Sequence, residues 1–179
     1  MHLVGFCVYG ASLVLLYCAS TGYHWVSLPP RGEDLLRRFD HSAIFLLIAG
    51  TYTPVCLVNL RGDWGWTLFG VIWALATLGV VLKVFFRHLP RWATSAIYLG
   101  MGWLAVVAIV PLVRSVPVGG LIWLLVGGIA YTVGAVIYAL RRPDPLPAVV
   151  GFHGVFHVFV LVGSATHFVF MLGYVVPVA

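Results

Sequence analysis

The amino-acid sequence predicts an all-α integral membrane protein, a single bundle of six transmembrane helices. Two observations predict this class. Of the 179 residues, 62% are hydrophobic and only 8% are charged, whereas a soluble domain usually carries about 25% charged residues. The apolar residues also fall in blocks of about 20, the length that a helix needs to cross the hydrocarbon core of a bilayer.

Six apolar blocks follow one another along the chain. They are apolar on all sides, whereas the strands of a membrane barrel would alternate apolar and polar residues, so helices are favoured. The connections hold nearly all the charges and are too short for a folded domain, which predicts one transmembrane domain over residues 1–179. Pro54 and Pro111 lie inside blocks and should kink their helices. The blocks cover residues 3–24, 41–60, 65–85, 93–113, 118–140 and 149–175.

Cationic residues predict the orientation. The odd-numbered connections carry eight of the ten Lys and Arg residues, and connections rich in these residues stay in the cytoplasm. Both chain ends are therefore expected to face outward. The net charge of +5 reflects this topology and does not indicate a nucleic-acid partner, since no soluble basic face is expected. The eight residues are Arg31, Arg37, Arg38, Lys83, Arg87, Arg91, Arg141 and Arg142, and the other two are Arg61 and Arg114.

Three polar clusters stand at the ends of the blocks. Ser20 and His24 are four residues apart near the end of the first block, so they share one helix face. Asp40 stands at the start of the second block, and His153 and His157 are four apart at the start of the last. Ionisable residues are costly in a membrane and are therefore candidates for function. The predicted orientation puts all three clusters at one depth, near the cytoplasmic interface.

Three neutral histidines suit a zinc site of the catalytic type, which keeps one position open to water. We expect nitrogens of His24, His153 and His157 to converge at about 3–3.5 Å from one another, as tetrahedral zinc ligands do. Asp40 and Ser20 would then hydrogen-bond the water or the ligands.

Each residue also has a simpler interpretation. His24 would be an interfacial histidine that reaches water, and Asp40 the N-cap of its helix. His153 and His157 would be histidines bonded to carbonyls within the bundle. For the set as a whole, the common depth favours a site over these separate roles.

The segments 40–54, 19–24 and 153–157 resemble the haemolysin III family, which belongs with the progestin and adipoQ receptors and the adiponectin receptors. The resemblance covers essentially the whole chain. It implies a cell-membrane protein, in a bacterium one of the inner membrane. It also implies a zinc ion held by His24, His153 and His157 near the cytoplasmic face, with Asp40 and Ser20 in contact with the water that completes its coordination. The family has seven spans and an inward N-terminus; this chain resembles spans two to seven, either as a fragment or as a six-helix form.

The chemistry of such a site is left open between enzyme and non-enzyme roles. A zinc-dependent hydrolase of lipid amides or esters would use Asp40 as general base, and membrane lipid would be its substrate. Alternatively, zinc only fastens helices together in a receptor or sensor. A cytolytic pore is the third alternative, although no ring of charges runs along the spans to form an ion path. Protein partners are not indicated by the sequence.

The orientation is testable with reporter fusions. Because the cationic connections alternate with nearly neutral ones, a reporter fused after Ala179 should be active if it works outside the cytoplasm and inactive if it works inside it. Activity of the cytoplasmic reporter alone would overturn both the topology and the common depth of the three clusters.

Overall fold

The computed structural model describes residues 1–85, 90–145 and 150–178, and in these ranges the chain is helical with no strand. Six helices there, 23 to 30 residues long, are long and apolar enough to cross a membrane. Many of their large apolar side chains are exposed, as in Leu3, Leu78 and Val107. A soluble protein rarely exposes so much apolar surface, so these side chains are expected to face lipid. The predicted all-α membrane class is confirmed.

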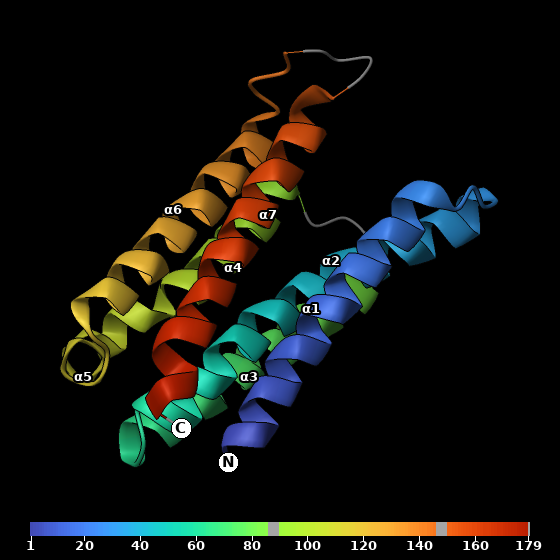
Figure 1. Ribbon diagram of the computed structural model, residues 1–179. Coiled ribbons are helices and arrows are strands. Elements are labelled where there is room, and N and C mark those ends of the chain that lie inside the picture. Colours follow the sequence, from blue (N-terminus) through green and yellow to red (C-terminus); the bar gives the residue numbers. More distant parts are fainter. Residues whose placement is uncertain (86–89, 146–149, 179) are drawn as a thin grey trace. The chain divides into compact units, whose positions relative to one another are not determined.

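The chain divides into two compact units, Met1–Leu89 and Pro90–Ala179, and each is described by itself. In the first unit α1 (His2–Trp25), α2 (Pro30–Pro54) and α3 (Asp63–Phe85) follow one another. α2 packs against α1 and against α3; Figure 1 shows α1 lying along α2. A π-helical turn, η1 (Val55–Asn59), continues α2 directly after Pro54. The ring of Pro54 removes a backbone N–H, so the predicted irregularity at this proline is found.

In the second unit, α4 (Arg91–Gly102), the 3₁₀ segment η2 (Trp103–Ala108) and α5 (Ile109–Ser115) make up one span. The span expected over 93–113, with a kink at Pro111, is interrupted by this 3₁₀ segment. Pro111 accounts for it, because a proline ring clashes with the carbonyl four residues before it, here in η2. α6 (Val118–Leu140) packs against α4 and α7 (Gly151–Phe170), and Figure 1 shows α6 and α7 side by side along most of their length. The short segments η3 (Met171–Val175) and η4 (Val176–Val178) end the described chain.

The start of the second helix differs from the prediction. α2 begins at Pro30, not near residue 41, so the cationic segment before the apolar block is helical as well. Pro30 is the first helical residue, where the fixed φ of proline favours a helix and its missing N–H costs nothing. Asp40 consequently lies inside α2, whose N-cap is Pro29. The interpretation of Asp40 as an N-cap is wrong. Arg87, one of the predicted cytoplasmic cations, lies outside the described residues.

Small residues bring the helices close together. A Cβ on Gly79 of α3 would overlap the Phe45 ring of α2, and one on Gly50 would overlap the Ser12 hydroxyl of α1. In the second unit, Gly163 of α7 lies against the Tyr131 ring of α6 in the same way. Lipid tails are as apolar as leucine, so the hydrophobic effect does not drive helices together inside a bilayer, and close packing at small residues contributes instead.

Hydrogen bonds between side chains of neighbouring helices complete this packing. Trp73 Nε1 donates to Thr53 Oγ1 (3.1 Å) in the first unit, and Trp103 Nε1 donates to Thr132 Oγ1 (3.0 Å) in the second. Such bonds between membrane helices each contribute about 0.6–2 kcal/mol.

Two glycines of α3 test the role of close packing. Gly79→Ala should lower the stability of the protein by about 1–3 kcal/mol, because the added methyl group meets the Phe45 ring in a well-packed interior. Gly70→Ala on the same helix is the control, since a Cβ there meets nothing within 4 Å; it should be neutral or stabilising by up to about 1 kcal/mol. Thermal unfolding in detergent measures both. Equal melting temperatures for the two variants would contradict the packing described.

Candidate metal centre

Two of the three histidines of α7 face each other. His153 and His157 lie in its first two turns, as predicted, and their Nε2 atoms are 3.1 Å apart. The ring planes are perpendicular, with centroids 4.6 Å apart. Two imidazoles at this separation either share one hydrogen bond or direct both ring nitrogens toward one cation. A separation of about 3–3.5 Å is what two ligands of a tetrahedral zinc ion require.

Aromatic rings pack against this pair. Tyr138 of α6 packs against His153 with ring centroids 5.8 Å apart, and Phe156 lies 5.9 Å from the same histidine. The Arg91 guanidinium, from the first turn of α4, lies 5.6 Å from the centre of the Tyr138 ring and 5.9 Å from that of Phe152. α4, α6 and α7 therefore meet beside the histidine pair, and cation–π contacts contribute to holding them there.

Asp144 fixes the beginning of α7. Its Oδ1 accepts a hydrogen bond from the Phe152 backbone N–H (2.8 Å), one of the first N–H groups of a helix that have no partner within it. The residue before the helix, Val150, makes no capping bond with its side chain. Asp144 thus orients the turn that carries His153. Sequence analysis missed it because capping residues normally directly precede the helix, whereas Asp144 is eight residues before its partner.

The first unit carries the other predicted residues. Ser20 and His24 lie on the last turns of α1; Ser20 is half-buried and His24 exposed. The His24 ring lies beside that of Tyr23, with centroids 4.8 Å apart. α1 packs along α2, the helix that carries Asp40. The role of His24 as a zinc ligand and that of Ser20 in contacting the bound water stay predictions.

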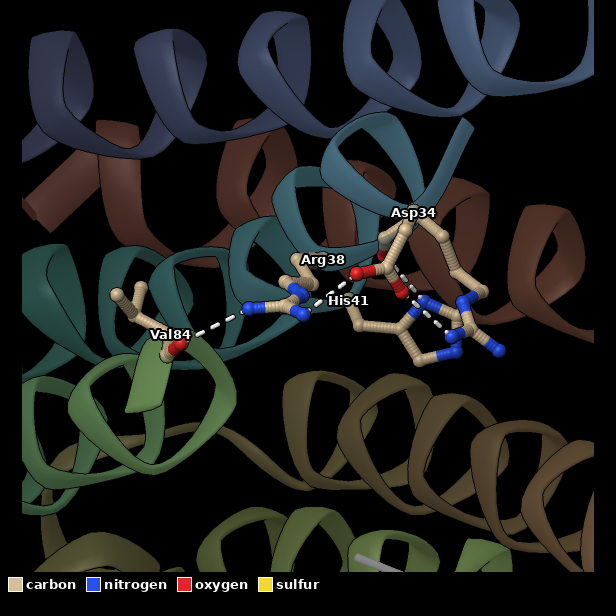
Figure 2. A network of polar contacts seen from close by, with 5 residues as sticks. Asp34, Arg38, His41 and Val84 are labelled. Atoms are coloured by element: carbon tan, nitrogen blue, oxygen red, sulfur yellow. Dashed lines mark hydrogen bonds and ion pairs between the residues drawn. The ribbon is translucent and has the colours of Figure 1, made fainter. Parts of the chain in front are cut away.

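Asp40 is the one acidic side chain buried among the described residues, with 5% of its surface exposed. The contact that the structure gives its carboxylate is with His41, whose Nδ1 lies 3.4 Å from Oδ2. The same nitrogen donates to the Arg37 carbonyl at 2.8 Å. His41 is therefore held by a backbone group of its own helix, α2; Figure 2 shows its side chain there. A buried carboxylate is costly unless a cation or a hydrogen-bond donor compensates it. Asp40 is therefore suited to a site that supplies a cation or a hydrogen-bond donor.

His167, the third histidine of α7, has a different environment. Its Nε2 lies 3.3 Å from the Leu124 carbonyl of α6, and its ring packs on Tyr131. Tyr131 in turn hydrogen-bonds Ser164 (2.8 Å). His167 thus has its own partners inside the second unit, which makes it a suitable control for the pair.

Known proteins are similar to nearly the whole length of this chain. The family model described as "Haemolysin-III related" matches residues 1–168. "Hemolysin-3" of Bacillus cereus is 47% identical over 176 residues, which are 98% of this chain and 77% of the relative. "Hemolysin-3 homolog" of Bacillus subtilis (strain 168) is 41% identical over 98% of this chain and 79% of the relative. With its six apolar helices, the chain is a multi-pass protein of the bacterial cell membrane and belongs to the haemolysin-III-related family.

Proposed function

We propose that the protein is a zinc-dependent hydrolase of lipid amides or esters, with His24, His153 and His157 as the metal ligands. The observation that carries the proposal is the 3.1 Å separation of the His153 and His157 nitrogens, which suits two ligands of one tetrahedral ion. Imidazole nitrogens favour zinc over magnesium or calcium, which prefer oxygen ligands. His24 completes the three-histidine set that the sequence predicts.

Asp40 and Ser20 supply the remaining chemistry. A zinc ion held by the three histidines would lower the pKa of a coordinated water toward about 7 and would polarise a carbonyl. Asp40 then accepts the proton of the attacking water as general base and returns it to the leaving amine or alcohol. The Ser20 hydroxyl orients that water. Because these residues lie on helices that span the membrane, the substrate class is amphiphilic, with its scissile group held at the depth of the site.

A role in fastening helices is the second candidate. It requires only the three histidines, because a metal ion held by His24 of α1 and by the pair of α7 would stabilise the fold without any turnover. Asp40 separates the two candidates. A buried general base is required for hydrolysis, whereas fastening requires only the ligands. A third role, lysis of membranes, is favoured only by the name of a relative, "Hemolysin-3". Liposome leakage that persists after chelation of metal would support it.

The metal assignment is testable on α7. His157→Ala removes one proposed ligand and should reduce zinc bound to the purified protein by about tenfold or more, with a lower melting temperature. His167→Gln is the matched control on the same helix. Its Nε2 lies against the Leu124 carbonyl and is not a proposed ligand. The zinc content of this variant should therefore stay unchanged. Metal analysis of both variants decides: equal zinc in wild type and in His157→Ala would refute the ligand set.

The catalytic role is testable at Asp40. Asp40→Asn keeps the size of the side chain and its ability to hydrogen-bond, but the amide cannot accept the proton of a water molecule. Zinc content and melting temperature should therefore stay near those of the wild type, while kcat on a panel of lipid amides and esters falls about 10²–10⁴-fold. A fully active Asp40→Asn variant would exclude this mechanism. If the wild type turns over no member of the panel yet retains zinc, the fastening role is the correct one.

A further inference from the structure

The side chain of Arg91, the first residue of α4, lies against two aromatic rings of its own unit. Its guanidinium carbon is 5.6 Å from the centre of the Tyr138 ring of α6 and 5.9 Å from that of the Phe152 ring of α7. Both distances lie within the reach of cation–π attraction, about 6 Å. Among the residues that the structure describes, Arg91 takes part in no ion pair. In this part of the chain, the partners of its charge are the two rings.

The place of Arg91 in its helix does not favour a cation. Arg91 directly follows the N-cap residue Pro90. A positive charge in the first turn is repelled by the positive end of the helix dipole, which favours acidic residues there. The orientation of the protein requires cations in this connection, but it does not require one at this particular position. The contact with the two rings supplies a reason for an arginine as the first residue of α4.

The two rings that contact Arg91 also contact His153. The Tyr138 ring lies 5.8 Å from the imidazole of His153, and the Phe152 ring lies 6.3 Å from it with the two planes nearly perpendicular. Phe152 directly precedes the histidine on α7, whereas Tyr138 belongs to α6. The guanidinium therefore acts on His153 through two rings from different helices. All four residues belong to the second unit.

The backbone of α7 does not by itself fix the direction of an imidazole. The torsion that turns a histidine ring about its bond to Cβ has broad minima, so the ring needs neighbours to hold it. The 3.1 Å separation between the Nε2 atoms of His153 and His157 requires a particular direction of each ring. A histidine that is already held in its ligand direction loses less freedom when it binds a metal, and groups that orient metal ligands in this way raise metal affinity.

We propose that Arg91 is a positioning residue of the candidate metal centre, which holds the Tyr138 and Phe152 rings against His153 and thereby raises the affinity of the site for zinc. The inference rests on the metal ligands of the proposed function but not on hydrolysis. A positive charge near the site repels a zinc ion, so the charge of Arg91 alone would make zinc binding weaker. Positioning through the rings has the opposite effect. The direction of the change on removal of Arg91 separates the two.

The test measures the zinc affinity of the purified protein by competition with a chelator of known affinity. Arg91→Gln keeps a long polar side chain but removes the guanidinium, and it should weaken zinc binding about tenfold, as loss of a group that orients a ligand does. Arg91→Lys keeps a cation for the rings and should lose no more than about threefold. Arg141→Gln is the matched control, because it removes another exposed cation from the same predicted side of the membrane. Its zinc affinity should equal that of the wild type.

A second measurement uses the metal-free protein. With histidines labelled by ¹⁵N, Arg91→Gln should move the NMR signals of the His153 ring and leave those of His167, whose Nε2 lies against the Leu124 carbonyl. The melting temperature of each metal-free variant shows whether it is folded. Arg91 is exposed, so its replacement should be tolerated; if Arg91→Gln does not fold, Arg91→Met, which keeps the apolar stem, takes its place with the same expected losses.

Three outcomes would overturn the positioning role. The first is zinc binding by Arg91→Gln that equals or exceeds that of the wild type. The second is an equal loss in Arg141→Gln, which would show a general effect of cations at this side. The third is an unchanged set of His153 signals in metal-free Arg91→Gln. A wild type that binds no zinc would instead refute the metal ligands of the proposed function. The NMR measurement then decides about Arg91 by itself: shifted His153 signals support positioning, and unchanged signals exclude it.

Discussion

The hydrocarbon core of a membrane offers no hydrogen-bond partner to a backbone or a polar side chain. Helices meet this constraint because their backbone bonds close within one segment, and the chain accordingly is helical throughout its described spans. The constraint also governs its side chains. Thr51, Thr53 and Thr77 each donate to a carbonyl four residues earlier on their own helix. The hydroxyl groups of these threonines are thus satisfied locally, within their own helices.

The same constraint bears on the candidate site residues Asp40, His153 and His157. A carboxylate buried to 5% exposure with a 3.4 Å contact to His41 is costly where the dielectric is low. The histidine pair meets nitrogen to nitrogen at 3.1 Å, whereas Nε2 of His167 lies against the Leu124 carbonyl. Retaining such groups on spanning helices is reasonable if a cation and a water molecule complete them, which is the basis of the zinc proposal.

α2 connects the parts of the first unit. Its beginning carries Arg38, its middle carries Asp40, and Phe45 and Gly50 make the close contacts with α3 and α1. Arg38, one of the cations that predict the orientation, also has a structural role. Through Val84 it ties the end of α3 to the helix that bears the proposed general base.

Within the candidate site, sequence patterns anticipated some features and missed others. The i, i+4 spacing of His153 and His157 predicted that they share a helix face, because that spacing is a property of any helix. The same local rules misplaced Asp40 as an N-cap. The boundary of the apolar block was taken as the boundary of the helix, whereas hydropathy reports where lipid begins and not where helical backbone bonds begin. Pro30 and the charged residues after it extend α2 beyond the block.

The sequence by itself determined the membrane class, the number of spanning helices and the residues available for a site. Composition and block length control these features, because the bilayer acts on every residue of a span alike. Only the tertiary structure decided which groups meet. Asp144 caps a helix from eight residues away, Arg38 bonds a carbonyl 46 positions along the chain, and Tyr138 packs on His153 from a neighbouring helix. No periodicity encodes such contacts, because they depend on how two helix faces fit together at small residues such as Gly79 and Gly163.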